Sequence, residues 1–130
     1  MVVVVIIALL AAFIVPRVLD RVDEARIIEL TDELLEKFPP KKVSIVDFLG
    51  AQFDTGLAWV HFPVGHGGLA ANPKHQRIIN EKLSAAGAPF SMPRNPIGHG
   101  MCGPTVVEWG SEEQKKRYLR PLFTGEEVWC

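Results

Sequence analysis

The stretch from Val18 to Phe38 is the part of the sequence that most constrains the fold. Its apolar residues recur at intervals of three and four, which is the spacing of one face of an α-helix. Charged residues fill most of the other positions, so the opposite face is expected to meet solvent. Pro39 and Pro40 end the pattern, because proline lacks an N–H and turns the preceding residue away from helical angles. The pattern predicts one amphipathic helix, which must bury its apolar face against other elements.

Three later segments begin with residues that are typical of helix starts. Ser44 and Ser111 are each followed three residues later by an acidic or amide side chain, the spacing of a capping box, and Asn72 is followed by proline. These signals predict helices over 44–56, 73–86 and 111–120, the last ending at Arg120 before Pro121. Because no alternating apolar pattern and no internal repeat occurs, the fold class is expected to be all-α, with four to five helices.

The segment Gly98–Gly103, GHGMCG, fits the spacing G-x-G-x-x-G of dinucleotide-binding turns. That motif must follow a buried strand, yet residues 89–96, PFSMPRNP, contain three prolines. The simpler interpretation is a helix whose small residues lie close against a neighbour or a ligand. In the TVVEWG that follows, Val106, Val107 and Trp109 are expected to resume a buried pattern.

Met1 to Val15 form a run of fifteen residues without a charge. The run is shorter than the roughly 20 apolar residues of a membrane-spanning helix and longer than a typical buried core segment. No basic residue precedes it, which disfavours a signal peptide. Arg17, Arg21 and Arg26 follow, so an anchor would leave the rest of the chain in the cytoplasm. A membrane anchor, an added core helix or strand, and a mis-set start all stay open.

Charge and cysteine content exclude several classes of protein. The net charge of −1 offers no basic surface for nucleic acid. Two cysteines, 28 residues apart, suggest neither a disulfide framework nor a zinc site, and they favour a reducing, cytoplasmic location. The four histidines lack the helical spacing of metal ligands, so no metal site is expected.

Two stretches resemble the N-terminal helical domain of the acyl-CoA dehydrogenase family. FPVGHGGLAANPKHQRIINEKLSAAGAP is similar to the family's aromatic-proline and glycine-glycine loop, followed by a helix with a glutamate, here Glu81, and a closing Gly-Ala-Pro. IGHGMCGPTVVEWGSEEQKKRYLRPLFTGEEVWC is similar to its glycine-spaced helix, its G-[ST]-E-E-Q-K turn and the RYL that follows. The resemblance covers residues from about Trp59 to Cys130. Residues 16–58 carry no signature, and residues 1–15 do not match.

The resemblance implies an orthogonal helical bundle within a three-part flavoenzyme. It divides the chain into an apolar segment of uncertain status at 1–15, the helical domain at 16–125 and the start of the middle barrel domain at 126–130. Such enzymes use FAD to desaturate an acyl-CoA between its α and β carbons, a reaction of fatty-acid β-oxidation, and they usually pass electrons to electron-transferring flavoprotein. A full-length enzyme of this kind is expected to be a homo-oligomer.

The resemblance also indicates which residues touch the substrate. The helix from about Ile97 to Val106 corresponds to the one that lines the acyl tunnel, so Ile97, Met101 and Thr105 are the candidates for acyl contact, with plain core packing as the alternative. No catalytic residue is expected in this chain, because the base comes from the third domain. Trp129 and Cys130 are expected near the flavin but not on it.

By itself, a chain with one wall of an acyl site, no flavin cradle and no base is expected to be inactive. The alternative is a non-catalytic helical interaction module, tethered to a membrane by Met1–Val15.

Overall fold

The computed structural model describes the backbone of residues 2–130 and the side chains of residues 3–9, 12 and 20–130. Its longer helices are α1 (Val2–Lys37), α2 (Ile45–Asp54), α3 (Gln76–Ala85), α4 (Gly103–Trp109) and α5 (Glu112–Thr124). Two short 3-10 helices, η1 (Pro73–His75) and η2 (Met92–Arg94), and a π-helical turn, η3 (Gly98–Cys102), complete the regular structure. Residues 2–130 contain no β-strand, only an isolated bridge between Val64 and Gly68. The expected all-α class is confirmed.

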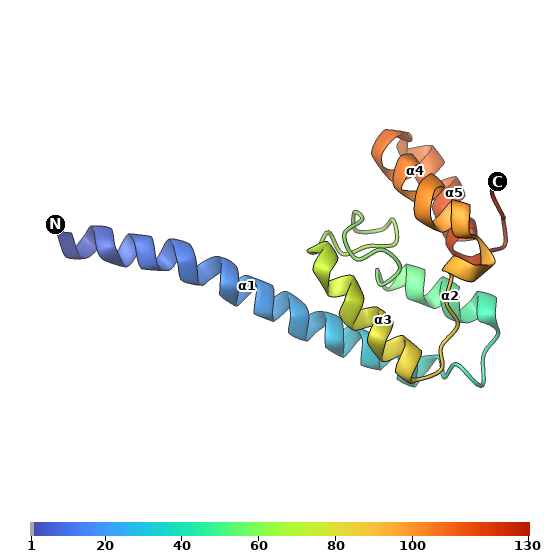
Figure 1. Ribbon diagram of the computed structural model, residues 1–130, viewed down its shortest axis with the longest axis horizontal. Helices are drawn as coiled ribbons and strands as arrows, with labels where there is room; N and C mark the ends of the chain where they lie inside the picture. Colours follow the sequence, from blue (N-terminus) through green and yellow to red (C-terminus); the bar gives the residue numbers. More distant parts are fainter. Residues whose placement is uncertain (1) are drawn as a thin grey trace.

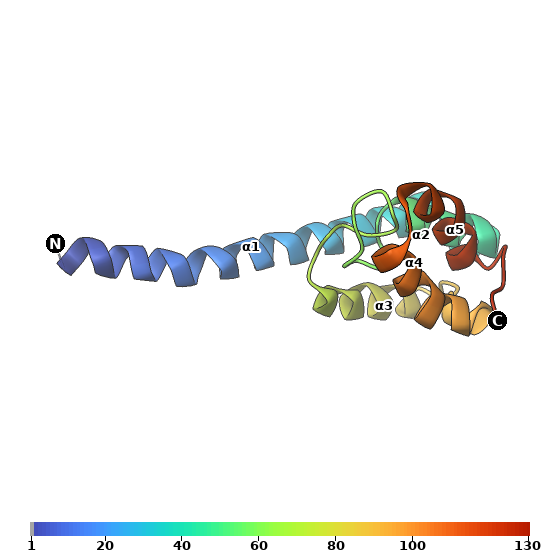
Figure 2. The same cartoon turned by 90° about the horizontal axis from the view of Figure 1, so that it is seen from above.

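Helix α1 is longer than predicted and has two different halves. It runs without interruption from Val2 through Pro16 to Lys37, and its N-terminal half extends away from the cluster of the other helices (Figures 1 and 2). Six described apolar side chains near its start are at least 50% exposed: Val3, Val4, Val5, Ile6, Ile7 and Leu9. None of them belongs to the core. Among the described residues, no helix combines the length and the apolar character needed to cross a membrane.

The second half of α1 packs against α3 and closes one side of the core. Ile27, Thr31 and Leu34 are at most 2% exposed. The Thr31 hydroxyl donates to the Ile27 carbonyl at 2.7 Å, which satisfies this buried polar group within the helix. Val22, expected on the apolar face, is 58% exposed.

The three helix starts that the capping residues predict are found, and one predicted helix end is wrong. Ser111 and Gln114 form a complete capping box, and Ser44 Oγ accepts from the Asp47 N–H at 3.1 Å. Helix α5, however, continues through Pro121 to Thr124 and ends at Gly125, whose φ of +80° is left-handed. Leu122 and Phe123 lie beyond the proline and are almost completely buried. We attribute the extra turn to their burial, which outweighs the one hydrogen bond that proline removes.

The centre of the core is aromatic. Trp59, in the loop after α2, stacks on Phe62 with 4.7 Å between ring centroids and meets the edge of Phe123 from α5 at 5.0 Å. Phe48 of α2 is completely buried. The loop is held to α3, because the Val60 N–H donates to Gln76 Oε1 at 2.7 Å.

Candidate functional site

The helical stretch that carries the candidate acyl contacts begins beside a buried asparagine. Asn95 is fully buried, and its Oδ1 accepts from the Gly98 N–H at 3.2 Å, with Pro96 between them as the first helical residue. This is an N-cap followed by proline, as at Asn72 and Pro73. Sequence reasoning missed Asn95, although the repeated Asn-Pro pair was the signal that would have found it.

Asn95 also joins this helix start to the end of the chain. Its Nδ2 donates to the carbonyls of Leu122 at 3.1 Å and Glu127 at 3.0 Å. Its Oδ1 accepts a second hydrogen bond, from the Trp129 N–H, at 3.1 Å. One side chain therefore fixes the start of the 96–109 stretch relative to α5 and to residues 127–129.

The glycine-spaced segment is a helix and not a phosphate-binding turn. The Gly98 N–H is bonded to Asn95, and the Gly103 N–H donates to the Gly98 carbonyl. A Cβ atom on Gly103 would lie 3.1 Å from the Trp59 ring, so glycine lets the helix approach this aromatic residue closely. Because both amides are engaged within the helix, this segment does not fit the pyrophosphate of FAD.

Ile97, Met101 and Thr105 follow one another at intervals of four and face outward. Ile97 is 43% exposed, Met101 is 67% exposed, and Thr105 is also exposed. The Thr105 hydroxyl donates to the Met101 carbonyl at 2.7 Å. These three side chains are outside the buried core of this chain, and their contact with an acyl chain stays a prediction.

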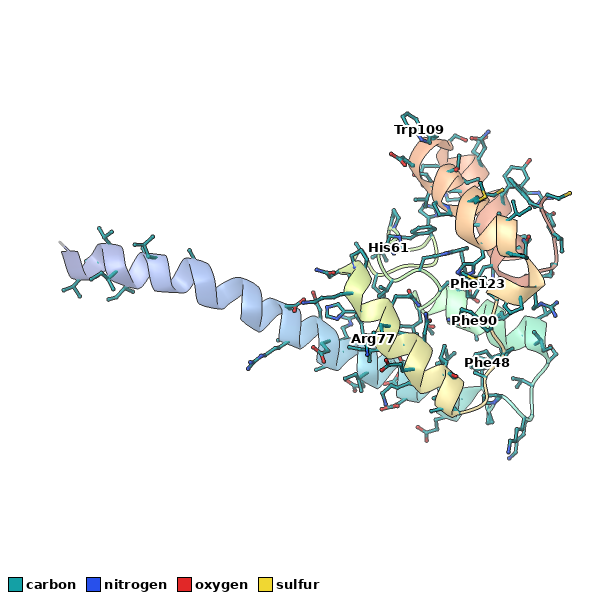
Figure 3. The ribbon with its side chains drawn as sticks, in the orientation of Figure 1. Phe48, His61, Arg77, Phe90, Trp109 and Phe123 are labelled. Carbon is teal, nitrogen blue, oxygen red and sulfur yellow. The ribbon has the colours of Figure 1, made fainter. Side chains whose placement is uncertain are left out.

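Trp109 lies four residues after Thr105, on the same side of the helix. We call Ile97, Met101, Thr105 and Trp109 the outer row. The expectation that Trp109 is buried is wrong, since it is 80% exposed, and Figure 3 shows it at the outer end of α4. Val106 and Val107 are half-buried against the core. Val107 lies across the helix from Trp109, whereas Val106, three residues before Trp109, is its neighbour on the helix surface.

The two residues expected near a flavin lie beyond the end of α5. The Trp129 ring packs edge-on against Tyr118 at 5.4 Å, and Cys130 is exposed. Arg117 donates to Glu127 at 2.8 Å and holds the pKa of Glu127 below its ordinary value. Proximity of Trp129 and Cys130 to a flavin stays a prediction.

Elsewhere, one pair of titratable side chains links the loop before α3 to α5. His66 is 8% exposed, and its Nε2 lies 2.9 Å from Glu112 Oε2 in the first turn of α5. This hydrogen bond, followed by one from Lys115, lowers the pKa of Glu112. Within the described part of the chain, no three His, Cys, Asp or Glu side chains gather where they could hold a metal ion.

Comparison with known proteins gives matches to acyl-CoA dehydrogenases. Residues 14–126 match the family model of the acyl-CoA dehydrogenase N-terminal domain. Acyl-CoA dehydrogenase IpdE1 of Mycolicibacterium smegmatis is 36% identical over 75 residues, which are 58% of this chain and 19% of that protein. Acyl-CoA dehydrogenase FadE34 of Mycobacterium tuberculosis is 36% identical over 77 residues, 59% of this chain and 10% of that protein.

A probable acyl-CoA dehydrogenase of Bacillus subtilis is 38% identical over 76 residues, 58% of this chain and 12% of that protein. The aligned part thus spans less than a fifth of the length of each of these relatives. No solved structure matches the sequence at a significant level.

Proposed function

Because the chain belongs to the acyl-CoA dehydrogenase family, we propose that it forms the N-terminal helical domain of an FAD-dependent enzyme that desaturates acyl-CoA thioesters between the α and β carbons. In this proposal the chain contributes one wall of the acyl pocket. The reaction requires a carboxylate that removes the α-proton and a flavin that accepts hydride from the β-carbon. Both are expected from other domains of the enzyme.

The observation that carries this proposal is the outward side of the 96–109 stretch. Ile97 and Met101 are large apolar residues that stay exposed on a helix whose opposite side packs into the core. Apolar side chains that converge on a site supply most of the lining of pockets for lipid-like ligands. The Asn95 bonds fix this helix, so the side chains are presented from a rigid element.

Several finer points belong to the same proposal. We expect the full-length enzyme to lie in the cytoplasm, to act on acyl-CoA, to pass electrons to electron-transferring flavoprotein and to form a homo-oligomer. The division of the chain into 1–15, 16–125 and 126–130 is also proposed, although α1 runs continuously across the first boundary. The 130-residue polypeptide alone is expected to retain no flavin and to reduce no acceptor dye with acyl-CoA.

The test compares two exposed methionines in the product of this reading frame extended past codon 130. Met101 is 67% exposed on the outer row, and Met92 is 42% exposed in η2. We expect Met101→Lys to lower kcat/KM for a long-chain acyl-CoA by about tenfold or more, because a charge replaces an apolar pocket contact. Dye reduction measures the rate.

Met92→Lys is the matched control and should leave kcat/KM unchanged. Equal losses in both variants would contradict an acyl contact at Met101.

A second candidate function is a non-catalytic helical interaction module tethered to a membrane by Met1–Val15. The observation that favours it is the row of exposed apolar side chains from Val3 to Leu9. Flotation with neutral phospholipid vesicles would test it. Recovery of the polypeptide with the vesicles, abolished by deleting residues 2–9, would support the tether, and recovery entirely in the aqueous fraction would exclude it.

A further inference from the structure

A hollow of about 310 Å³ lies between α2, α3 and the turn that follows α3, and we call it the amide pocket. Its lining residues are Gln52, Asn80, Leu83, Ser84, Ala88, Pro89 and Phe90. None of them belongs to the outer row, so the pocket is separate from the proposed acyl wall and independent of its chemistry. A cavity of about 150 Å³ can hold a benzene molecule, so the amide pocket accommodates an aromatic ring with one substituent.

One wall of the amide pocket is the side of α3 that carries Asn80, Leu83 and Ser84. These residues are three and four positions apart, so they lie on one face of the helix. Leu83 is 5% exposed and supplies apolar surface. Asn80 Oδ1 accepts from Gln76 Nε2 at 3.1 Å, which orients the Asn80 amide. No hydrogen bond among the described residues uses Asn80 Nδ2, which is therefore a donor that a ligand can engage.

A second wall is the turn after α3, which a Schellman motif fixes. Gly87 has a left-handed φ of +73°, its N–H donates to the Ser84 carbonyl at 3.0 Å, and the Ala88 N–H donates to the Leu83 carbonyl at 2.9 Å. Phe90 follows and is 50% exposed, so its ring offers a flat apolar surface (Figure 3). A wall that is already rigid loses little entropy when a ligand binds.

Gln52 of α2 supplies a polar group that is almost completely buried. It is 5% exposed, and its Nε2 donates to the Leu57 carbonyl at 3.0 Å, which fixes the amide group. Within the described part of the chain, its Oε1 accepts no hydrogen bond. This oxygen is not fully enclosed, because the one enclosed side-chain atom without a partner there is His99 Nδ1. The small accessible area of Gln52 therefore includes Oε1, an acceptor that a ligand can satisfy.

We propose that the amide pocket binds a neutral aromatic carboxamide, a flat ring that bears one –CONH₂ group. No charged side chain lines the pocket, and a buried charge without a partner is costly, so the ligand is neutral. The ring packs against Leu83 and Phe90. A carboxamide carries a donor and an acceptor on neighbouring atoms, which match Gln52 Oε1 and Asn80 Nδ2. Gln52 and Asn80 also share the lining of a smaller adjoining hollow, so the two side chains lie close together.

The experiment titrates the isotope-labelled 130-residue protein with benzamide and with acetophenone, in which a methyl group replaces the amino group. We expect benzamide to give saturable NMR shifts at the main-chain amides of Leu83, Ser84 and Phe90. Gln52→Met should weaken benzamide about five- to tenfold, the effect of one hydrogen bond, and leave acetophenone unchanged, because acetophenone has no N–H. Asn80→Leu should weaken both ligands by a similar factor, because both carry the carbonyl group. Asn80→Leu also keeps the test decisive if Gln52→Met does not fold.

Ser84→Trp gives a second test that does not alter the core. Ser84 is exposed and lines the amide pocket, so a large ring there should block entry and abolish the benzamide shifts. Ala86→Trp is the matched control, because Ala86 is exposed two residues further on, is not part of the lining and should leave binding unchanged. The proposal would be overturned by no saturable shift up to the solubility of benzamide, shifts confined to the outer row, equal losses of both ligands in Gln52→Met, or benzamide binding that survives Ser84→Trp.

Discussion

Asn95 shows how much of this fold depends on one side chain. It makes four hydrogen bonds, two as donor and two as acceptor, and all four partners are main-chain groups. Two of them belong to the last four residues of the chain, and one to the buried end of α5. A buried amide with four such hydrogen bonds stabilises the fold by more than the sum of those bonds, because its loss leaves several main-chain groups without partners.

We predict that Asn95→Ala lowers the free energy of unfolding by about 2–4 kcal/mol, since it removes a cap and leaves buried carbonyls unpaired. Urea denaturation measures the change. Asn72→Ala is the matched control, because Asn72 also caps a helix, accepts from the Lys74 N–H at 3.0 Å and is exposed. Its cost should be about 1 kcal/mol. Equal costs at the two positions would show that Asn95 acts only as a cap.

The His66–Glu112 pair makes stability depend on pH. The hydrogen bond from His66 lowers the pKa of Glu112 below its ordinary value of 4.5. The ionised form of Glu112 is therefore more favourable in the folded state than in the unfolded state. The resulting stabilisation is present above about pH 4.5 and is lost as the pH falls through the lower, folded-state pKa.

We therefore expect Glu112→Gln to lower Tm at pH 7 and to lower it less at pH 3. Thermal unfolding monitored by circular dichroism measures both values. Glu113→Gln, at an exposed neighbour that takes part in no described ion pair, should leave Tm unchanged at both values. A Tm difference for Glu112→Gln that is independent of pH would contradict an electrostatic origin.

At the scale of the elements, α1 has one half that stabilises the fold and one that does not. Leu34 is 1% exposed, while Val5 is 59% exposed on the same helix. We predict that Leu34→Ala costs about 2–4 kcal/mol in unfolding free energy and that Val5→Ala stays within about 0.5 kcal/mol of the wild type. Urea denaturation measures both changes in unfolding free energy. A large cost for Val5→Ala would mean that the first half of α1 packs against something in solution.

Helix starts with a capping residue could be predicted from the sequence, whereas the start of α1 at Val2 and the end of α5 could not. Ser44, Asn72 and Ser111 act through amides two or three residues away, so the local sequence contains all the information. The continuation of α5 past Pro121 depends instead on the burial of Leu122 and Phe123 by residues distant in sequence. The stabilisation from burying Leu122 and Phe123 can therefore be recognised only in the folded structure.

At the scale of the whole molecule, the fold class could be predicted because helical periodicity and the absence of alternation are global properties of the sequence. The positions of the candidate acyl contacts came from family resemblance, and their outward orientation came from the structure. The Asn-Pro pair would have revealed Asn95 as a helix cap but not as an organising residue. Its other partners lie at the end of α5 and in residues 127–129, and no sequence spacing shows that these segments meet.

The protruding half of α1 also affects how the molecule moves through water. A helix of 36 residues is about 54 Å long, and much of α1 extends beyond the helical cluster (Figure 2). Such a shape has more frictional drag than a compact particle of the same 14.4 kDa mass. The monomer should therefore leave a gel-filtration column early, at the volume of a larger globular protein. Sedimentation equilibrium, which depends on mass and not on shape, is the measurement that separates this elongated monomer from a true dimer.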